Sequence, residues 1–288
     1  MKLGVSTYSL SRAIRSGEMD VLGVMEWIKE LGGQHVEIVP IGFDLQENPE
    51  LIDQITAKAK QLNLEISNYA IGANFVKETE EQYRAEIEQV KRQVDIAHKL
   101  GVKIMRHDAA SRPVEQTSIK QFEEDLPKVA QACREIADYA AQYGITTSVE
   151  NHGRYLQASD RVQRLIHEVD RPNFKTTIDV GNFLCVDEDP VSAVKKNLPY
   201  TSNMIHLKDF YYRPAHLNPG EGWILTSNGN YLRGAVFGQG DIDVRQILKH
   251  LKHSGYEGYL SLEFEGMEEC KRGTQIGFDN IVRLWEEV

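Results

Sequence analysis

Short runs rich in β-branched and aromatic residues alternate with longer amphipathic segments along most of the chain. Such runs are typical of buried parallel strands, whereas apolar residues spaced three or four apart indicate helices that pack on one face. The helical spacing is clearest over Glu80–Leu100 and Phe122–Tyr143. The pattern predicts eight strands, at Leu3–Thr7, His35–Val39, Leu64–Tyr69, Lys103–His107, Thr146–Glu150, Lys175–Asp179, Asn203–Lys208 and Tyr259–Phe264.

This regular alternation favours one architecture. A strand followed by a helix, repeated along 288 residues, builds a parallel sheet that is most simply closed into a (β/α)8 barrel. Several expected helices end just before a glycine that leads into the next strand, as at Gly101 and Gly144, which fits left-handed helix caps. We therefore expect the α/β class, with residues 1–288 forming a single TIM-barrel domain.

One connection is much longer than the others. About thirty residues separate the seventh expected strand from the helix that begins near Asp243, whereas loops in α/β units usually have about 2–6 residues. Within this segment, Asn228-Gly229 lies between two β-prone runs, which predicts a hairpin turn. We expect Tyr211–Asp241 to form an ordered flap that helps to enclose a substrate; the alternative is a hairpin that packs outward and mediates subunit contacts.

Charge and composition narrow the classes of function. The chain has 33 Lys+Arg against 43 Asp+Glu, a net charge of −10, which would repel a phosphate backbone, so we expect no nucleic-acid partner. Three cysteines without paired metal-type spacing fit a reducing cytoplasm better than a disulfide framework. No apolar run approaches the roughly 18–20 residues of a membrane span. We expect a cytoplasmic protein that contacts no membrane, and homo-oligomerisation stays open.

Potential metal ligands stand at the ends of four consecutive expected strands, namely Glu150, Asp179, His206 and Glu263. In a barrel these strand ends converge on one mouth, which is the catalytic face. Carboxylate oxygens and an imidazole nitrogen are suitable donors for Mn²⁺, Mg²⁺, Co²⁺ or Zn²⁺. A single carboxylate at a strand end would more often cap a helix or form an ion pair. Four in succession favour a site for one divalent metal ion.

Four short motifs surround these positions: Val149-Glu150-Asn151-His152, Ile178-Asp179-Val180-Gly181-Asn182, Ile205-His206-Leu207-Lys208-Asp209 and Ser261-Leu262-Glu263-Phe264. They resemble the xylose-isomerase-like TIM barrels and, more narrowly, the sugar phosphate isomerase/epimerase group. The resemblance covers essentially the whole chain. It implies one divalent metal ion held by the four residues named above, with the two glutamates as catalytic acid and base and a small carbohydrate as substrate.

The sequence also departs from this family in ways that matter for function. Many relatives carry histidine where this chain has Asn182, and the multi-zinc endonuclease branch adds an Asp-x-His pair after the seventh strand. Neither feature is present here. Together with the net charge of −10, these departures disfavour cleavage of abasic DNA, although His107 at the fourth strand end fits a remnant ligand.

Six further polar residues are candidates for contacting the substrate. Glu37 ends the second strand, where it would bind polyol hydroxyls or orient a metal-ligating histidine, although a helix cap or ion pair is an equal alternative. Lys208 shares a strand face with His206 and suits a carbonyl oxygen or a phosphate. For a lone histidine, a structural role is the ordinary alternative. The full set is Glu37, His107, His152, Lys208, Arg233 and His216.

These residues support several reactions at one site. The leading hypothesis is a metal-dependent isomerase or epimerase that acts on a sugar, keto-polyol or sugar phosphate by proton transfer through an enediolate. The second is a metal-dependent dehydratase of an inosose-like substrate, which uses the same metal and bases. The third is a non-catalytic sugar-binding barrel, which is disfavoured because all four ligand positions hold competent residues.

Overall fold

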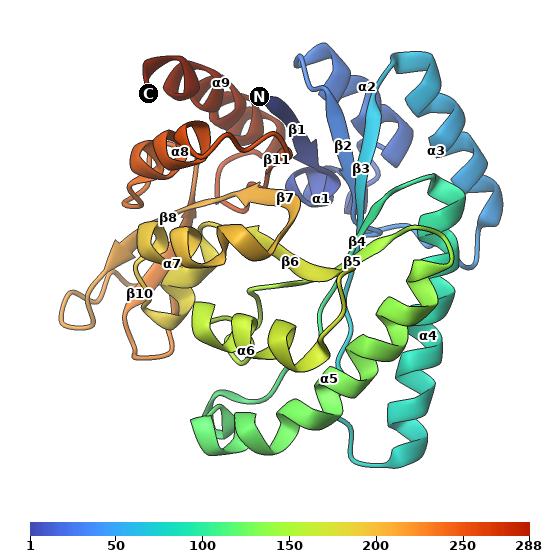
Figure 1. Cartoon of the computed structure of the whole chain (residues 1–288). Helices are drawn as coiled ribbons and strands as arrows, with labels where there is room; N and C mark the ends of the chain where they lie inside the picture. Colours follow the sequence, from blue (N-terminus) through green and yellow to red (C-terminus); the bar gives the residue numbers. More distant parts are fainter.

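The computed structural model describes all residues from 1 to 288, and it confirms the predicted barrel. Figure 1 shows the strands at the centre with helices around them. The closed sheet has the strand order β1-β11-β7-β6-β5-β4-β3-β2, and every pairing is parallel. Its strands, which agree with the predicted ones to within two residues, are β1 (Lys2–Ser6), β2 (His35–Ile38), β3 (Glu65–Ile71), β4 (Ile104–His107), β5 (Thr146–Glu150), β6 (Phe174–Asp179), β7 (Thr201–Leu207) and β11 (Tyr259–Leu262).

The helices lie on the outside of the barrel and bury their apolar faces against it. The longest two begin at side-chain caps: Thr79 caps α4 together with Gln82, and Ser118 caps α5. None of the helices combines the length and the apolar character that crossing a membrane would need. The α-helices are α1 (Ser11–Arg15), α2 (Val21–Glu30), α3 (Pro49–Leu62), α4 (Glu80–Leu100), α5 (Ile119–Ala141), α6 (Ser159–Val169), α7 (Pro190–Asn197), α8 (Val244–His253) and α9 (Cys270–Glu287), and the 3-10 segments are η1 (Thr7–Leu10), η2 (Val114–Gln116), η3 (Asn182–Val186) and η4 (Leu198–Tyr200).

The long connection after β7 forms a separate antiparallel sheet of three strands, β8 (Asp209–Arg213), β10 (Tyr231–Ala235) and β9 (Ile224–Leu225). The hairpin predicted from Asn228-Gly229 is confirmed, because β9 and β10 pair on either side of this turn. Asp187, just after η3, holds the turn by accepting hydrogen bonds from the backbone and side chain of Asn228. The hairpin is therefore docked against the loop that follows β6.

Asp209 fastens the two ends of this connection to each other. Its buried carboxylate accepts hydrogen bonds from the backbone N–H groups of Gly238 and Gly240, both at 2.9 Å, and of Phe210 at 2.8 Å. At Gly240 the chain approaches so closely that a Cβ would lie 2.1 Å from Asp209 Oδ1. Burial raises the pKa of Asp209 to about 6, and the hydrogen bonds from these glycines limit the rise. Asp209 thereby fixes the segment that leaves the end of β7.

We expect replacement of Asp209 by alanine to lower the free energy of unfolding by about 2–4 kcal/mol, because the backbone N–H groups of Phe210, Gly238 and Gly240 lose their buried acceptor. Urea denaturation measures this loss. The control is Asp241→Ala, since the partly exposed Asp241 pairs with Arg213 and its loss should cost less than about 1 kcal/mol. Equal losses in the two variants would contradict the anchoring role of Asp209.

Candidate metal centre

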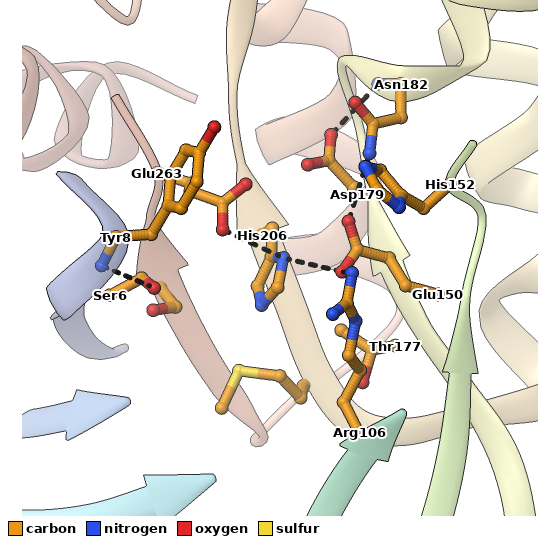
Figure 2. A network of polar contacts seen from close by, with 12 residues as sticks. Ser6, Tyr8, Arg106, Glu150, His152, Thr177, Asp179, Asn182, His206 and Glu263 are labelled. Carbon is orange, nitrogen blue, oxygen red and sulfur yellow. Dashed lines mark hydrogen bonds and ion pairs between the residues drawn. The ribbon is translucent and has the colours of Figure 1, made fainter. Parts of the chain in front are cut away.

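The structure brings together the four residues predicted to bind a metal ion. Glu150, Asp179, His206 and Glu263 each offer one ligand atom, and these atoms all lie within 4.8 Å of one another. The side chains come from the ends of β5, β6 and β7 and from the residue after β11. In Figure 2, Glu150 and Glu263 lie on opposite sides of the His206 ring. All four residues are buried.

The ring of His206 is held in one orientation by Glu37. Its Nε2 lies 2.8 Å from Glu37 Oε1, a carboxylate that is itself buried and that also accepts a hydrogen bond from Asn68. Since the carboxylate is the acceptor, Nε2 carries a proton, and Nδ1 is the nitrogen left to bind a metal ion. Burial would lower the pKa of His206, but the surrounding carboxylates raise it well above its usual value, so a bound metal ion would take the place of the proton on Nδ1. Nδ1 has no hydrogen-bond partner and lies 3.6 Å from Glu150 Oε2 and 3.8 Å from Glu263 Oε1. A carboxylate behind the second nitrogen is typical of metal-ligating histidines.

Asp179 also has a carboxylate oxygen without a hydrogen-bond partner. Its Oδ1 accepts hydrogen bonds from the backbone N–H groups of Gly181 and Asn182, at 2.8 and 2.9 Å. Its Oδ2 is buried without a hydrogen-bond donor, and the ion-pair contact with Lys208 Nζ at 3.0 Å lacks hydrogen-bond geometry. Buried polar atoms rarely stay unpaired, because burial without a partner is costly. Asp179 Oδ2 and His206 Nδ1, which both lack a hydrogen-bond partner, therefore fit ligands of a divalent metal ion.

Two buried cations balance part of the negative charge in this group. Lys208 Nζ lies 2.7 Å from Glu263 Oε2. On the other side, Arg106 Nη2 lies 2.6 Å from Glu150 Oε2 and 3.1 Å from Asp108 Oδ1. Buried carboxylates need such partners, because their removal from water is otherwise too costly. Each of the two glutamates thus has its own cationic neighbour.

These contacts shift the pKa values of the group in opposite directions. Burial alone would raise the pKa of Glu150, but Arg106 and His206 outweigh it and hold that pKa well below its usual range. For Asp179, burial dominates and raises the pKa to about 6, although Lys208 opposes the shift. Burial would lower the pKa of Lys208, yet the adjacent carboxylates raise it well above its usual value. At neutral pH, Glu150 is therefore ionised and Lys208 is protonated.

Asn182 links the two sides of the group through its side-chain amide. Its Nδ2 donates to Glu150 Oε1 at 3.0 Å, and its Oδ1 accepts from Lys208 Nζ at 3.4 Å. The amide stays neutral while it donates on one side and accepts on the other. Asn182 thus holds one oxygen of Glu150 and leaves the other to face His206.

A cavity of about 270 Å³ opens directly above these residues. Glu150, His206 and Glu263 line it, whereas Asp179 does not. One wall of the cavity is mainly apolar and comes from the segment after β2 and from the end of β3, whereas the opposite wall is polar. The lining consists of Tyr8, Val39, Pro40, Ile41, Ala70, Ile71, Gly72, Arg106, Glu150, His152, His206, Lys208, Glu263 and Glu265.

Three of the residues expected to contact substrate lie at or near this cavity. Lys208 and His152 line it, and His152 Nδ1 lies 3.4 Å from Asp108 Oδ1. Glu37 does not line the cavity and instead contacts His206 Nε2, on the side of the ring away from Nδ1. Of the two roles considered for Glu37, the geometry therefore favours orientation of the histidine.

The other three residues predicted to contact the substrate lie away from this cavity. His107 is fully buried with its ring against Phe75 and Phe174, on the side of β4 that faces the helices. Arg233 packs over the ring of Trp223, and neither it nor the exposed His216 lines the cavity. In this conformation, the segment Tyr211–Asp241 contributes no residue to the cavity wall. Direct substrate contact by these residues stays a prediction.

Three residues of the site were not found from the sequence: Arg106, Tyr8 and Glu265. Arg106 is the strand neighbour of His107, and adjacent residues point to opposite faces, so only the register of β4 decides which one faces the cavity. Tyr8 donates a hydrogen bond to Glu265 Oε2 at 3.3 Å, from the segment after β1. The signal for Glu265 was its spacing of two from Glu263, which places both on the same side.

We expect the protein to bind one divalent ion per chain, and His206→Ala to abolish this uptake. Glu37→Gln should weaken the affinity by about 10–100-fold, because an amide orients the histidine less strongly. Elemental analysis and calorimetric titration with Mn²⁺ measure both effects. The control is His152→Ala, which removes a cavity histidine outside the four-residue group and should change the affinity less than about threefold. Unchanged uptake by His206→Ala would show that the site is assigned wrongly.

Comparisons with known proteins relate this chain to one family of barrels. A profile described as xylose isomerase-like TIM barrel matches residues 25–282. An inosose dehydratase from Clostridium botulinum is 28% identical over 146 residues, which span 50% of this chain and only 48% of that protein. An inosose dehydratase from Geobacillus thermodenitrificans is 22% identical over 267 residues, spanning 79% of this chain and 88% of that protein.

The fold also matches a solved structure with a metal ion. The crystal structure of the IOLI protein with a bound zinc atom superposes with a TM-score of 0.74 at 18% identity, covering 100% of this chain and 99% of that one. At this identity the likeness is one of fold. Because the profile match extends over most of the sequence, the chain belongs to the xylose isomerase-like TIM barrel family.

Proposed function

We propose that this protein is a metal-dependent isomerase or epimerase, which removes a proton beside the carbonyl of a small polyhydroxy ketone and returns it. One observation carries the proposal: the two glutamates that line the cavity, Glu150 and Glu263, flank His206 from opposite sides. Carboxylates on two sides of a substrate suit removal of a proton on one face and its return on the other.

The chain's own groups supply the proton transfer. A divalent ion held by the four residues would polarise the substrate carbonyl and stabilise the negative charge of the enediolate. Glu150 is ionised at neutral pH, as a base must be, because Arg106 holds its pKa low. Glu263 faces the same cavity from the other side, beside the ammonium group of Lys208. Return of the proton to the original carbon from the opposite face gives epimerisation, and its return to the neighbouring carbon gives isomerisation.

The charges in the cavity favour an uncharged substrate. Arg106 contacts the carboxylates of Asp108 and Glu150, and Lys208 contacts those of Asp179 and Glu263. Both cations are thereby occupied, and a phosphate would have to compete with these carboxylates for its partner. We therefore favour a sugar or keto-polyol without phosphate.

Dehydration of an inosose-like substrate is the second candidate. It is favoured by the curated relatives, which are inosose dehydratases, although their identity to this chain is low. The same proton abstraction would be followed by loss of a hydroxyl group from the next carbon. His152 lines the cavity, its Nδ1 lies 3.4 Å from Asp108 Oδ1, and we assign it the role of protonating such a leaving group so that it departs as water.

The test incubates the Mn²⁺-loaded protein in deuterated water with each member of a panel of ketoses and inososes. NMR then measures the exchange of substrate protons for deuterium. We expect deuterium to enter beside the carbonyl. Conversion to an epimer or isomer supports the leading proposal, whereas an unsaturated ketone formed with loss of water supports the dehydratase. No exchange with any member would favour a non-catalytic sugar-binding barrel and contradict both.

Glu150→Gln and Glu263→Gln should each lower the exchange rate by at least about 100-fold, because an amide does not accept a proton at neutral pH. Metal occupancy is measured in parallel, since both residues belong to the ligand group. Glu257→Gln, at the opposite end of the barrel beside β11, serves as the control and should keep the full rate. Near-normal exchange by either variant at full occupancy would exclude that residue as a base.

A further inference from the structure

A second hollow adjoins the cavity above the candidate metal centre. It has a volume of about 190 Å³ and lies between the segment after β2 and one face of α4. Pro40, Ile71 and Gly72 line both hollows, so the two meet along a rim made by these residues. Neither hollow alone reaches the volume of about 300 Å³ at which small-molecule sites usually begin, whereas the two together exceed it.

The lining of the second hollow combines side-chain amides with aromatic and aliphatic groups. Gln89 and Gln93 both donate to Gln46 Oε1, at 2.9 and 3.1 Å, and Gln93 accepts a hydrogen bond from Tyr69 at 2.6 Å. The ring of Phe43 lies in the same wall. Amides both donate and accept, and an aromatic ring packs on C–H groups, so this lining suits a hydroxylated ring with an apolar face.

The charged residues of this lining disfavour an anionic occupant. The charged residues of this lining are Asp44 and Glu86, and no lysine or arginine belongs to it. Glu86 is paired with Lys77 at 3.0 Å, and Asp44 accepts two backbone hydrogen bonds in its own loop. A phosphate or carboxylate placed here would meet like charges without a cationic partner, which disfavours its binding.

At the rim between the two hollows, Gly72 contributes no side chain. A Cβ built on Gly72 would meet nothing closer than Asp108 Oδ2 at 3.9 Å, so neither backbone conformation nor packing demands glycine at this position. Because Gly72 lines both hollows and a Cβ there meets nothing closer than 3.9 Å, we expect a larger side chain to fill part of the space where they meet. Gly72 therefore adds no side chain to the rim that the two hollows share.

We propose that the second hollow binds a second uncharged hydroxylated ring, linked to the ring that reacts at the metal centre. The substrate is then a keto-glycoside, with its carbonyl at the four-residue group and its second ring across the rim at Gly72. This inference rests on the proposed function, because that function places the reacting ring beside Glu150 and Glu263.

The test compares binding of one-ring and two-ring probes by calorimetric titration of the Mn²⁺-loaded protein. The probes are 3-keto-glucose and the 3-keto derivatives of cellobiose, maltose and trehalose. We expect at least one two-ring probe to bind about tenfold more tightly than 3-keto-glucose. In Gly72→Leu this gain should disappear while the affinity for 3-keto-glucose stays within about twofold, and Gly72→Ala should lie between the two.

A second variant keeps the test decisive if Gly72→Leu does not fold, as thermal unfolding would reveal. Gln93→Ala removes an amide of the second hollow and should reduce the two-ring gain without altering the affinity for 3-keto-glucose. Equal affinities for one-ring and two-ring probes, or a gain that survives both variants, would overturn the inference. A preserved two-ring gain without any proton exchange would instead contradict the proposed function and leave the binding site standing.

Discussion

The hydrogen bond between Glu37 and His206 is the contact on which the site depends. Both side chains are buried, so each would be destabilised without the other. The 2.8 Å contact assigns the proton to Nε2 and turns Nδ1 toward the carboxylates of Glu150 and Glu263. Were the ring free to rotate, no nitrogen would be directed at the point where the four ligand atoms converge.

The barrel makes this contact possible because it closes β1, β2 and β11 into one sheet, so that residues from distant parts of the sequence share its interior. Glu37 and His206 are 169 positions apart in sequence. Asp209, three residues after His206, then fixes the direction in which the chain leaves the mouth. A rigid sheet and a fastened loop together hold the ligands before any ion binds, which is the preorganisation that a metal site requires.

The sequence was sufficient for features that depend on local pattern. Strand–helix alternation predicted the barrel, and the placement of Glu150, Asp179, His206 and Glu263 at four strand ends predicted that they would meet. Features that depend on register or on distant partners were not predictable in this way. A shift of one residue separates Arg106, which faces Glu150, from His107, which faces Phe75. The docking of the hairpin on Asp187 likewise depends on a contact between distant segments.

The central claim is that these four residues hold one divalent ion with the His206 ring fixed by Glu37. Anomalous diffraction from crystals grown with Mn²⁺ tests it most directly. The account predicts one strong manganese peak per chain, about 2.0–2.3 Å from His206 Nδ1 and from an oxygen of each of the three carboxylates. A manganese peak elsewhere, no peak at full Mn²⁺ saturation, or coordination through Nε2 with Glu37 displaced would contradict it.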